Sequence, residues 1–132
     1  MAPHVLDTHA ALWNYSARAM LGKTAESALA GAKQDKLIIS DVTLSEIGRL
    51  FVAGKIKVSG DEAQWMETFA RAHNVVPVSA RIAWRAATYA FSHRDPCDRH
   101  ILATADVLGL TLVTKDDTLT KAARSQGVTV IW

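Results

Sequence analysis

The sequence has little of several features that mark special classes of protein. One cysteine, Cys97, among 132 residues permits no internal disulfide and no cysteine-rich zinc site. No uninterrupted apolar run approaches the ~20 residues of a membrane span. The start, Met1-Ala2-Pro3-His4, lacks the charged and then apolar pattern of a signal peptide. We therefore expect a cytoplasmic protein.

Neither sign of charge dominates the chain. Fifteen basic against 13 acidic residues give a formal net charge of +2, which is compatible with nucleic acid but does not require it. Apolar residues make up 49%, enough for a core and too many for a disordered chain. The length fits one domain, which we place at residues 1–132. Basic side chains in the C-terminal half belong on solvated helix faces when taken singly, but as a group beside acids they could hold phosphates. They are Arg81, Arg85, Arg94, Arg99, Lys115, Lys121 and Arg124.

Short apolar runs alternate with helical patterns along the whole chain. The strand-like runs are residues 4–6, 37–40, 75–78, 110–114 and 128–132. Segments between them repeat apolar residues at helical spacing. Strands that alternate with helices predict an α/β fold, here a three-layer α/β/α sandwich with a five-stranded parallel sheet. Pro77 has no amide donor, so we expect its strand at or near a sheet edge.

The predicted helices have recognisable start and stop signals. One helix spans residues 24–33, and the next begins at Ser40 or Asp41 and ends at Gly54. Residues 59–62 have capping-box spacing at the start of a third helix. The remaining helices begin at Ser79, at Asp95-Pro96 and at Thr118, and Gly127 ends the last one.

Four carboxylates stand where a parallel sheet would gather them at one edge. Each follows a predicted strand or lies in the first turns of the helix after a strand; they are Asp7, Glu46, Asp98 and Asp116. Parallel strands end, and their helices begin, at the same edge of a sheet, so the four should converge. Unpaired carboxylates repel by about 4 kcal/mol per close pair at an effective dielectric of ~20. A hard divalent cation with oxygen ligands, or bound protons, would neutralise this cluster.

Each acid also has a purely structural interpretation. Asp7 can cap the helix after the first strand, Asp98 can complement a helix dipole, and Asp116 or Asp117 can cap the helix at Thr118. Glu46 can be a solvated helix residue. The structural interpretation is weaker for the four together, because Glu46 lies beyond an N-cap and the others come from separate chain crossings.

Four segments carry a resemblance to a known family, in order and at the expected intervals. They are Val5-Leu6-Asp7-Thr8-His9-Ala10, Ser45-Glu46-Ile47 followed by Gly54-Lys55-Ile56, Arg94-Asp95-Pro96-Cys97-Asp98-Arg99, and Leu112-Val113-Thr114-Lys115-Asp116. In these segments the chain resembles the PIN-domain ribonucleases, and among them the VapC-type toxins of bacterial toxin–antitoxin pairs. The family usually has an apolar aromatic residue or leucine where this chain has Cys97. It usually has one acid where this chain has Asp116-Asp117, and the spacing from Thr114 favours Asp116.

The resemblance implies a Mg²⁺- or Mn²⁺-dependent endoribonuclease. The four acids Asp7, Glu46, Asp98 and Asp116 would hold the cation directly or through waters. Thr114, with Thr8 or Ser40, would orient them, and Arg99 and Lys115 would neutralise the phosphate. The implied partners are an RNA substrate, a VapB-type antitoxin and a second copy of the chain. The surface expected for the second copy is Trp65, Met66 and Phe69, and the apolar surface expected for the antitoxin is Leu12, Trp13, Leu50 and Phe51.

Other functions stay open at this point. A nuclease of the same fold could mature RNA without being a toxin. A non-catalytic scaffold could bind RNA or protein, although it would have no reason to keep four repelling acids. A histidine acid/base ribonuclease would need no metal, and the five histidines lack the spacing of zinc ligands. A magnesium-binding receiver domain would need a phosphoacceptor aspartate where this chain has Ser79.

Overall fold

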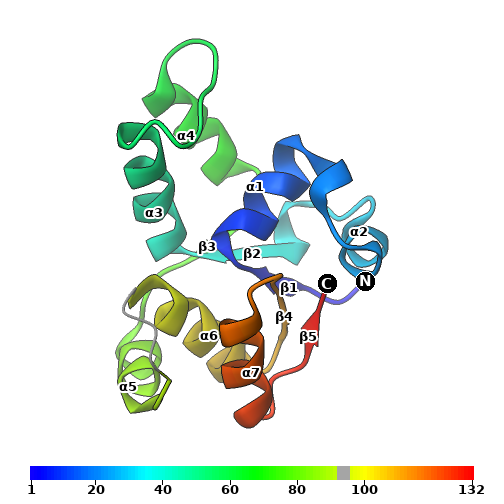
Figure 1. The fold of residues 1–132 in the computed structure, drawn as a ribbon, viewed down its shortest axis with the longest axis vertical. Coiled ribbons are helices and arrows are strands. Elements are labelled where there is room, and N and C mark those ends of the chain that lie inside the picture. The colour runs from blue at the N-terminus through cyan, green and yellow to red at the C-terminus, as the bar shows by residue number, and fades with distance from the viewer. Residues whose placement is uncertain (92–95) are drawn as a thin grey trace.

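The computed structural model describes residues 1–91 and 96–132, which form a parallel sheet flanked by helices (Figure 1). The sheet has five strands in the order β3-β2-β1-β4-β5, all paired in parallel. The strands are β1 (His4–Leu6), β2 (Leu37–Ser40), β3 (Asn74–Val76), β4 (Thr111–Val113) and β5 (Val130–Ile131). The predicted five-stranded parallel sheet is confirmed.

Helices connect consecutive strands. They are α1 (Thr8–Ser16), α2 (Lys23–Leu29), α3 (Asp41–Val52), α4 (Glu62–Arg71), α5 (Ala80–Thr88), α6 (Pro96–Leu108) and α7 (Asp117–Ser125). Two short 3₁₀ helices, η1 (Arg18–Met20) and η2 (Gln34–Lys36), lie on either side of α2. Within the described ranges no helix is long and apolar enough to cross a membrane.

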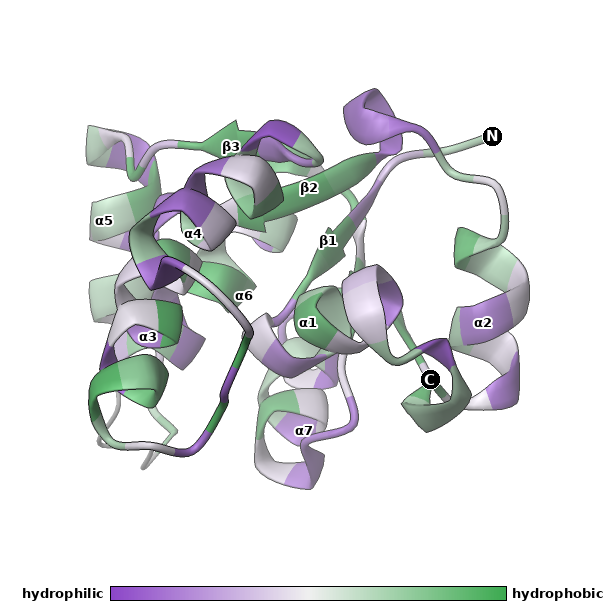
Figure 2. Cartoon of the chain, turned by 90° about the horizontal axis from the view of Figure 1, so that it is seen from above, coloured by the Kyte–Doolittle hydropathy of each residue, from purple (hydrophilic) through white to green (hydrophobic). Residues whose placement is uncertain are grey.

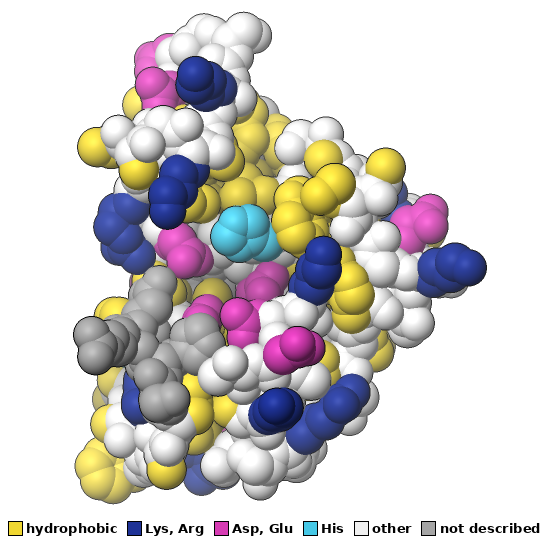
Figure 3. Space-filling view, in the orientation of Figure 1, with side chains coloured by type: hydrophobic (Ala, Val, Ile, Leu, Met, Phe, Trp, Pro, Cys, Tyr) yellow, Lys and Arg dark blue, Asp and Glu magenta, His cyan; other side chains and the backbone are white. Residues whose placement is uncertain are grey.

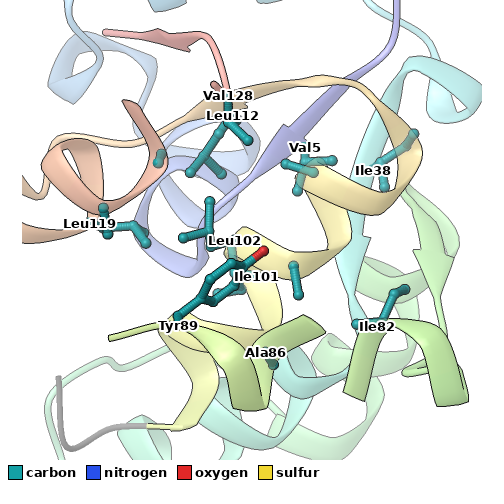
Figure 4. Close-up of a cluster of buried hydrophobic side chains, with 14 residues drawn as sticks. Val5, Ile38, Ile82, Ala86, Tyr89, Ile101, Leu102, Leu112, Leu119 and Val128 are labelled. Atoms are coloured by element: carbon teal, nitrogen blue, oxygen red, sulfur yellow. The ribbon is translucent and has the colours of Figure 1, made fainter. Parts of the chain in front are cut away.

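Different helices cover the two faces of the sheet. Side chains alternate along a strand, so Val5 and Leu112 point to one face while Leu6 and Val113 point to the other. The first pair packs with apolar residues of α5, α6 and α7 (Figure 4). The second pair packs with apolar residues of α1 to α4. This arrangement confirms the predicted three-layer sandwich.

Hydropathy follows this layering. Figure 2 shows β1 and β2 as hydrophobic strands, whereas the surrounding helices carry both hydrophobic and hydrophilic residues. All four residues of β2 are buried, as expected for a strand covered on both faces. The core therefore fixes the central strands, and through them the edge where their carboxyl ends meet.

Several predicted helix ends are confirmed. Ser40 caps α3 and Ser79 caps α5, and each side-chain hydroxyl accepts a bond from a backbone N–H of its helix. Gly54 ends α3 at φ 71°, and the next amide, of Lys55, donates to the carbonyl of Leu50 at 2.9 Å. A glycine adopts this left-handed conformation without the steric cost that a Cβ would bring.

Other predicted ends were wrong. The helix expected over residues 24–33 stops at Leu29, because Gly31 turns the chain at φ 70° and η2 follows. The N-cap of α4 is Asp61, two residues after Ser59 in the predicted capping box. Asp95, the expected cap of α6, lies outside the described residues.

The strand with the proline has the predicted place. β3 is at the edge of the sheet and ends at Val76, one residue before Pro77. The missing amide donor of Pro77 therefore costs the sheet no hydrogen bond.

Candidate active site at the carboxyl edge of the sheet

A pocket of about 440 Å³ lies where β1 and β4 end. All four predicted acids line it, together with Thr8, His9, Trp13 and Lys115. The acids come from four places: the β1–α1 junction, α3, the first turn of α6 and the β4–α7 junction. Figure 3 shows acidic side chains gathered around a hollow on this face, with a histidine beside them. The predicted convergence of Asp7, Glu46, Asp98 and Asp116 is therefore present.

Asp7 is the most enclosed of these acids, with 9% of its surface exposed. Its Oδ1 accepts a bond from the amide of Ala10 at 2.8 Å and so caps α1. Its Oδ2 accepts a bond from the hydroxyl of Thr114 at 2.5 Å. The sheet register brings Asp7 and Thr114 together, because each directly follows one of the paired residues Leu6 and Val113. Asp7 is thus both a helix cap and a fixed member of the pocket.

Burial also changes the acidity of this carboxyl. Desolvation raises the pKa of Asp7 above its usual value, and the nearby charge of Glu46 raises it further. The bonds from Thr114 and Ala10 and the charge of His9 act in the opposite direction but are smaller. Asp7 therefore binds a proton more readily in the folded chain than a solvent-exposed aspartate does.

Asp116 is joined to Asp7 through Thr114. The backbone amide of Asp116 donates to the hydroxyl oxygen of Thr114 at 3.1 Å, and the same hydroxyl donates to Asp7. The Asp116 side chain caps α7 by accepting from the amide of Leu119 at 2.7 Å. Asp117 is the exposed first residue of α7 and is not among the residues that line the pocket. Of the two adjacent acids, Asp116 is the one in the pocket.

The remaining predicted hydroxyls bond elsewhere. Thr8 lines the pocket, but its hydroxyl donates to the hydroxyl of Thr43 at 3.3 Å, which joins α1 to α3. Ser40 uses its side chain to cap α3. Glu46 on α3 and Asp98 on α6 are half-buried in the pocket wall. Thr114 is the hydroxyl that contacts the acids.

The basic residues divide into one that faces the pocket and others that do not. Lys115 lines the pocket, with its Nζ 5.8 Å from the centroid of the Trp13 ring. Arg85 is paired with Asp106 at 2.8 Å. Arg94 lies outside the described residues.

Arg99 is not among the residues that line the acidic pocket, and its guanidinium bonds to backbone carbonyls. Its guanidinium donates to the carbonyl oxygens of Tyr89 and Phe91, each at 2.6 Å, and to that of Ala86 at 3.3 Å. Ala86 lies in the last turn of α5, and Tyr89 and Phe91 follow that helix. Arg99 therefore holds the end of α5 against α6, and its expected role toward the phosphate stays a prediction.

The donor set is suited by its chemistry to a hard divalent cation. The pocket offers carboxylate and hydroxyl oxygens, the ligands that Mg²⁺ prefers, and no cysteine. Within residues 1–91 and 96–132, however, no three His, Cys, Asp or Glu side chains are arranged to hold a metal ion by themselves. Mg²⁺ retains several waters and needs only one or two direct carboxylates, so water can complete such a set.

Of the surface predicted for a second copy of the chain, Phe69 lies in the core, whereas Trp65 and Met66 are partly exposed. Phe69 is fully buried, and its ring lies 5.4 Å from that of Trp65 and 5.2 Å from that of Tyr15. These aromatic contacts close the space between α1 and α4. The prediction that Phe69 contributes to an interface was therefore wrong.

Two residues of the pocket were not among the predicted site residues, although Trp13 was expected on the antitoxin surface. His9 and Trp13 lie on α1, two and six residues after Asp7, and their rings lie 5.6 Å apart. The signal that could have identified them is helical spacing, because residues in the first turns of α1 share the edge at which Asp7 begins the helix.

Comparison with known proteins identifies the family of this chain. The chain belongs to the PIN domain family, whose sequence model matches residues 4–125. It is 30% identical over 131 residues to Ribonuclease VapC22 of Mycobacterium tuberculosis, an alignment that covers 98% of this chain and 99% of that protein.

Solved structures share the fold. FitAcB from Neisseria gonorrhoeae aligns with a TM-score of 0.67 and 21% identity, over 98% of this chain and 96% of that chain. VapBC2 from Rickettsia felis, bound to a DNA fragment from its promoter, aligns with a TM-score of 0.64 and 15% identity, over 97% and 96%. The predicted PIN-like α/β fold is confirmed.

Proposed function

We propose that this protein is a metal-dependent endoribonuclease and the toxin of a type II toxin–antitoxin pair. The observation that supports the nuclease best is the convergence of four acids from separate elements in one pocket, with Asp7 nearly buried. The similarity to a protein named Ribonuclease VapC22 favours RNA as the substrate.

In this proposal Asp7, Glu46, Asp98 and Asp116 would hold Mg²⁺ or Mn²⁺, directly or through water. When bound, the cation would supply positive charge for the phosphate and would make a water more acidic and so a better nucleophile. Thr114 fixes Asp7 and the start of α7 in one orientation. Lys115, at the pocket wall, adds positive charge where the phosphate of the substrate enters.

Metal removal tests the proposed chemistry. Cleavage of single-stranded RNA should stop in excess chelator and return when Mg²⁺ or Mn²⁺ is added. Products should carry 5′-phosphate and 3′-hydroxyl ends, because water attacks the phosphorus and the 2′-hydroxyl is not used. Ends with 2′,3′-cyclic phosphates would instead support the histidine acid/base alternative.

The proposed partner is a small VapB-type antitoxin that covers the acidic pocket. The similarity to VapBC2 and FitAcB supports a partner of this kind. An arginine of the partner would pair with the acids, since its planar guanidinium matches carboxylate geometry. Of the apolar surface predicted for this contact, Leu12 and Phe51 are 7% and 8% exposed and belong to the core. Trp13 and Leu50 remain partly exposed.

Expression in bacteria tests the proposal that the protein is a toxin. Wild type should arrest growth, the Asp98→Asn variant should not, and co-expressed antitoxin should restore growth. Equal growth of both strains without antitoxin would favour a scaffold or an RNA-maturation nuclease. The second copy of the chain and the cytoplasmic location stay predictions.

A further inference from the structure

An apolar pocket opens directly beside the acidic one. Its volume is about 230 Å³, and it is lined by His9, Leu12, Trp13, Ser16, Ile56, Lys57, Val58 and Trp65. His9 and Trp13 line both pockets, so the two are adjacent. Figure 3 shows hydrophobic side chains next to the acidic hollow on this face.

We propose that this apolar pocket binds one unpaired nucleobase of the RNA, next to the phosphate held at the acids. The inference deepens the proposed function and rests on it. The pocket is smaller than the ~300–1,000 Å³ typical of sites for drug-sized ligands, which suits a single planar group. Aromatic rings bind unpaired bases by stacking, because every base has a π-face.

Trp13 is held in place before any ligand arrives. Its ring is half-buried, 5.6 Å from the His9 ring and 5.7 Å from the Trp132 ring, at interplanar angles of 54° and 57°. A ring fixed in this way loses little freedom when a base stacks on it. Trp65 lines the same pocket and is fixed by Phe51 and Phe69, at 5.4 Å from each.

Charge distinguishes a nucleotide from an apolar peptide side chain. Exposed Lys57 lies at the apolar pocket, and exposed Lys115 lines the acidic pocket with its Nζ over Trp13. The two cations thus lie at adjacent pockets, where the backbone phosphates on either side of a stacked base would need them. A purely apolar partner side chain would have no use for them.

The test is a thermodynamic cycle between RNA and protein. A labelled single-stranded RNA that the wild type cleaves is compared with copies that have an abasic ribose at each nucleotide flanking the cleaved bond. Binding is measured by fluorescence anisotropy in chelator, where no turnover occurs, and kcat/KM is measured in Mg²⁺. The proteins are wild type, Val58→Trp to fill the pocket, and His9→Ala, whose exposed side chain can be removed without opening the core. The control is Trp84→Ala, at an aromatic residue of α5 that is 72% exposed.

One abasic position should weaken binding to the wild type about 5- to 150-fold, the range associated with one stacked base. Val58→Trp should bind intact RNA as weakly as wild type binds the abasic RNA. Removing the base should not weaken RNA binding to Val58→Trp any further. His9→Ala should show a reduced base effect, and Trp84→Ala the full effect. Circular dichroism confirms that each variant is folded, and His9→Ala carries the test if Val58→Trp is not.

The proposal is overturned if no abasic position matters for wild type, or if the full loss persists in both pocket variants. If Val58→Trp then fails to bind the antitoxin but still binds RNA like wild type, the pocket would be assigned to the protein partner. If RNA binding depends on the base but no RNA is cleaved, the base subsite would be supported and the nuclease proposal would be rejected. Cleavage without base dependence would remove only the subsite, and absence of both binding and cleavage would remove both proposals.

Discussion

The start of α1 and the start of α4 are capped in the same way but differ in every other respect. Asp7 accepts from the amide of Ala10 at 2.8 Å, and Asp61 accepts from the amide of Ala63 at 3.0 Å. Asp61 is exposed to solvent, whereas Asp7 is 9% exposed and has a second bond, from Thr114. Capping accounts fully for Asp61. It does not account for a buried carboxylate with a raised pKa, because a solvated aspartate would cap α1 equally well.

The largest expected difference between the two caps is in RNA cleavage. Asp7→Asn should reduce kcat/KM by at least about 100-fold, because removing a ligand should cost no less than removing its supporting partner. Asp61→Asn should stay within about twofold of wild type, as expected for a surface change. Initial rates on a single-stranded RNA in Mg²⁺ measure both. Wild-type cleavage by Asp7→Asn would remove Asp7 from the site.

A smaller effect is expected from removing the hydrogen bond from Thr114, which Asp7 accepts and Asp61 lacks. Thr114→Val removes the hydroxyl that donates to Asp7 and accepts from the amide of Asp116. Leaving these buried partners unsatisfied should lower the free energy of unfolding by about 1–3 kcal/mol. Thr88→Val, at an exposed hydroxyl of α5, is the matched control and should stay within about 0.5 kcal/mol. Urea denaturation without metal distinguishes them, and equal losses would show that Thr114 contributes only packing.

The smallest expected difference between the two caps is in the effect of their substitution on the stability of the metal-free protein and on its pH dependence. Asp61→Ala should lose about 1 kcal/mol, the usual cost of an N-cap. Asp7→Asn should stay close to wild type at neutral pH, because the amide keeps the cap and removes a buried charge, which offsets the lost bond from Thr114.

The pKa of Asp7 is raised in the folded state, so its contribution to stability is present below its unfolded pKa and is lost as pH rises through its folded pKa. The wild type should therefore gain stability relative to Asp7→Asn as pH falls through that window. Thermal unfolding of both proteins across this range measures the difference. Parallel curves would show that burial does not perturb Asp7.

What the sequence predicted well depends on local chemistry. The strands at residues 37–40 and 110–114, the caps at Ser40 and Ser79 and the stop at Gly54 each follow from side chains that act on their own neighbourhood. Convergence of the acids was also predictable, because the carboxyl ends of parallel strands share an edge whatever the details of packing.

What the sequence missed depends on distant partners. The direction of Arg99 is set by the carbonyls of Tyr89 and Phe91, whose position follows from how α5 packs on α6. The apolar pocket likewise joins α1 to Ile56 and Val58, in a connection between helices that has no periodic pattern. Neither contact leaves a signal in the local sequence.

The ends of the sheet limit how copies of this chain can associate. On one side β3 has three residues and is followed by Pro77, and on the other β5 has only two residues. Such short edges offer few free backbone groups to a neighbouring strand, which is how natural sheets resist edge-to-edge aggregation and domain swapping. A second copy would therefore join this one through side chains on its helices, and the sheet would not continue from one subunit into the next.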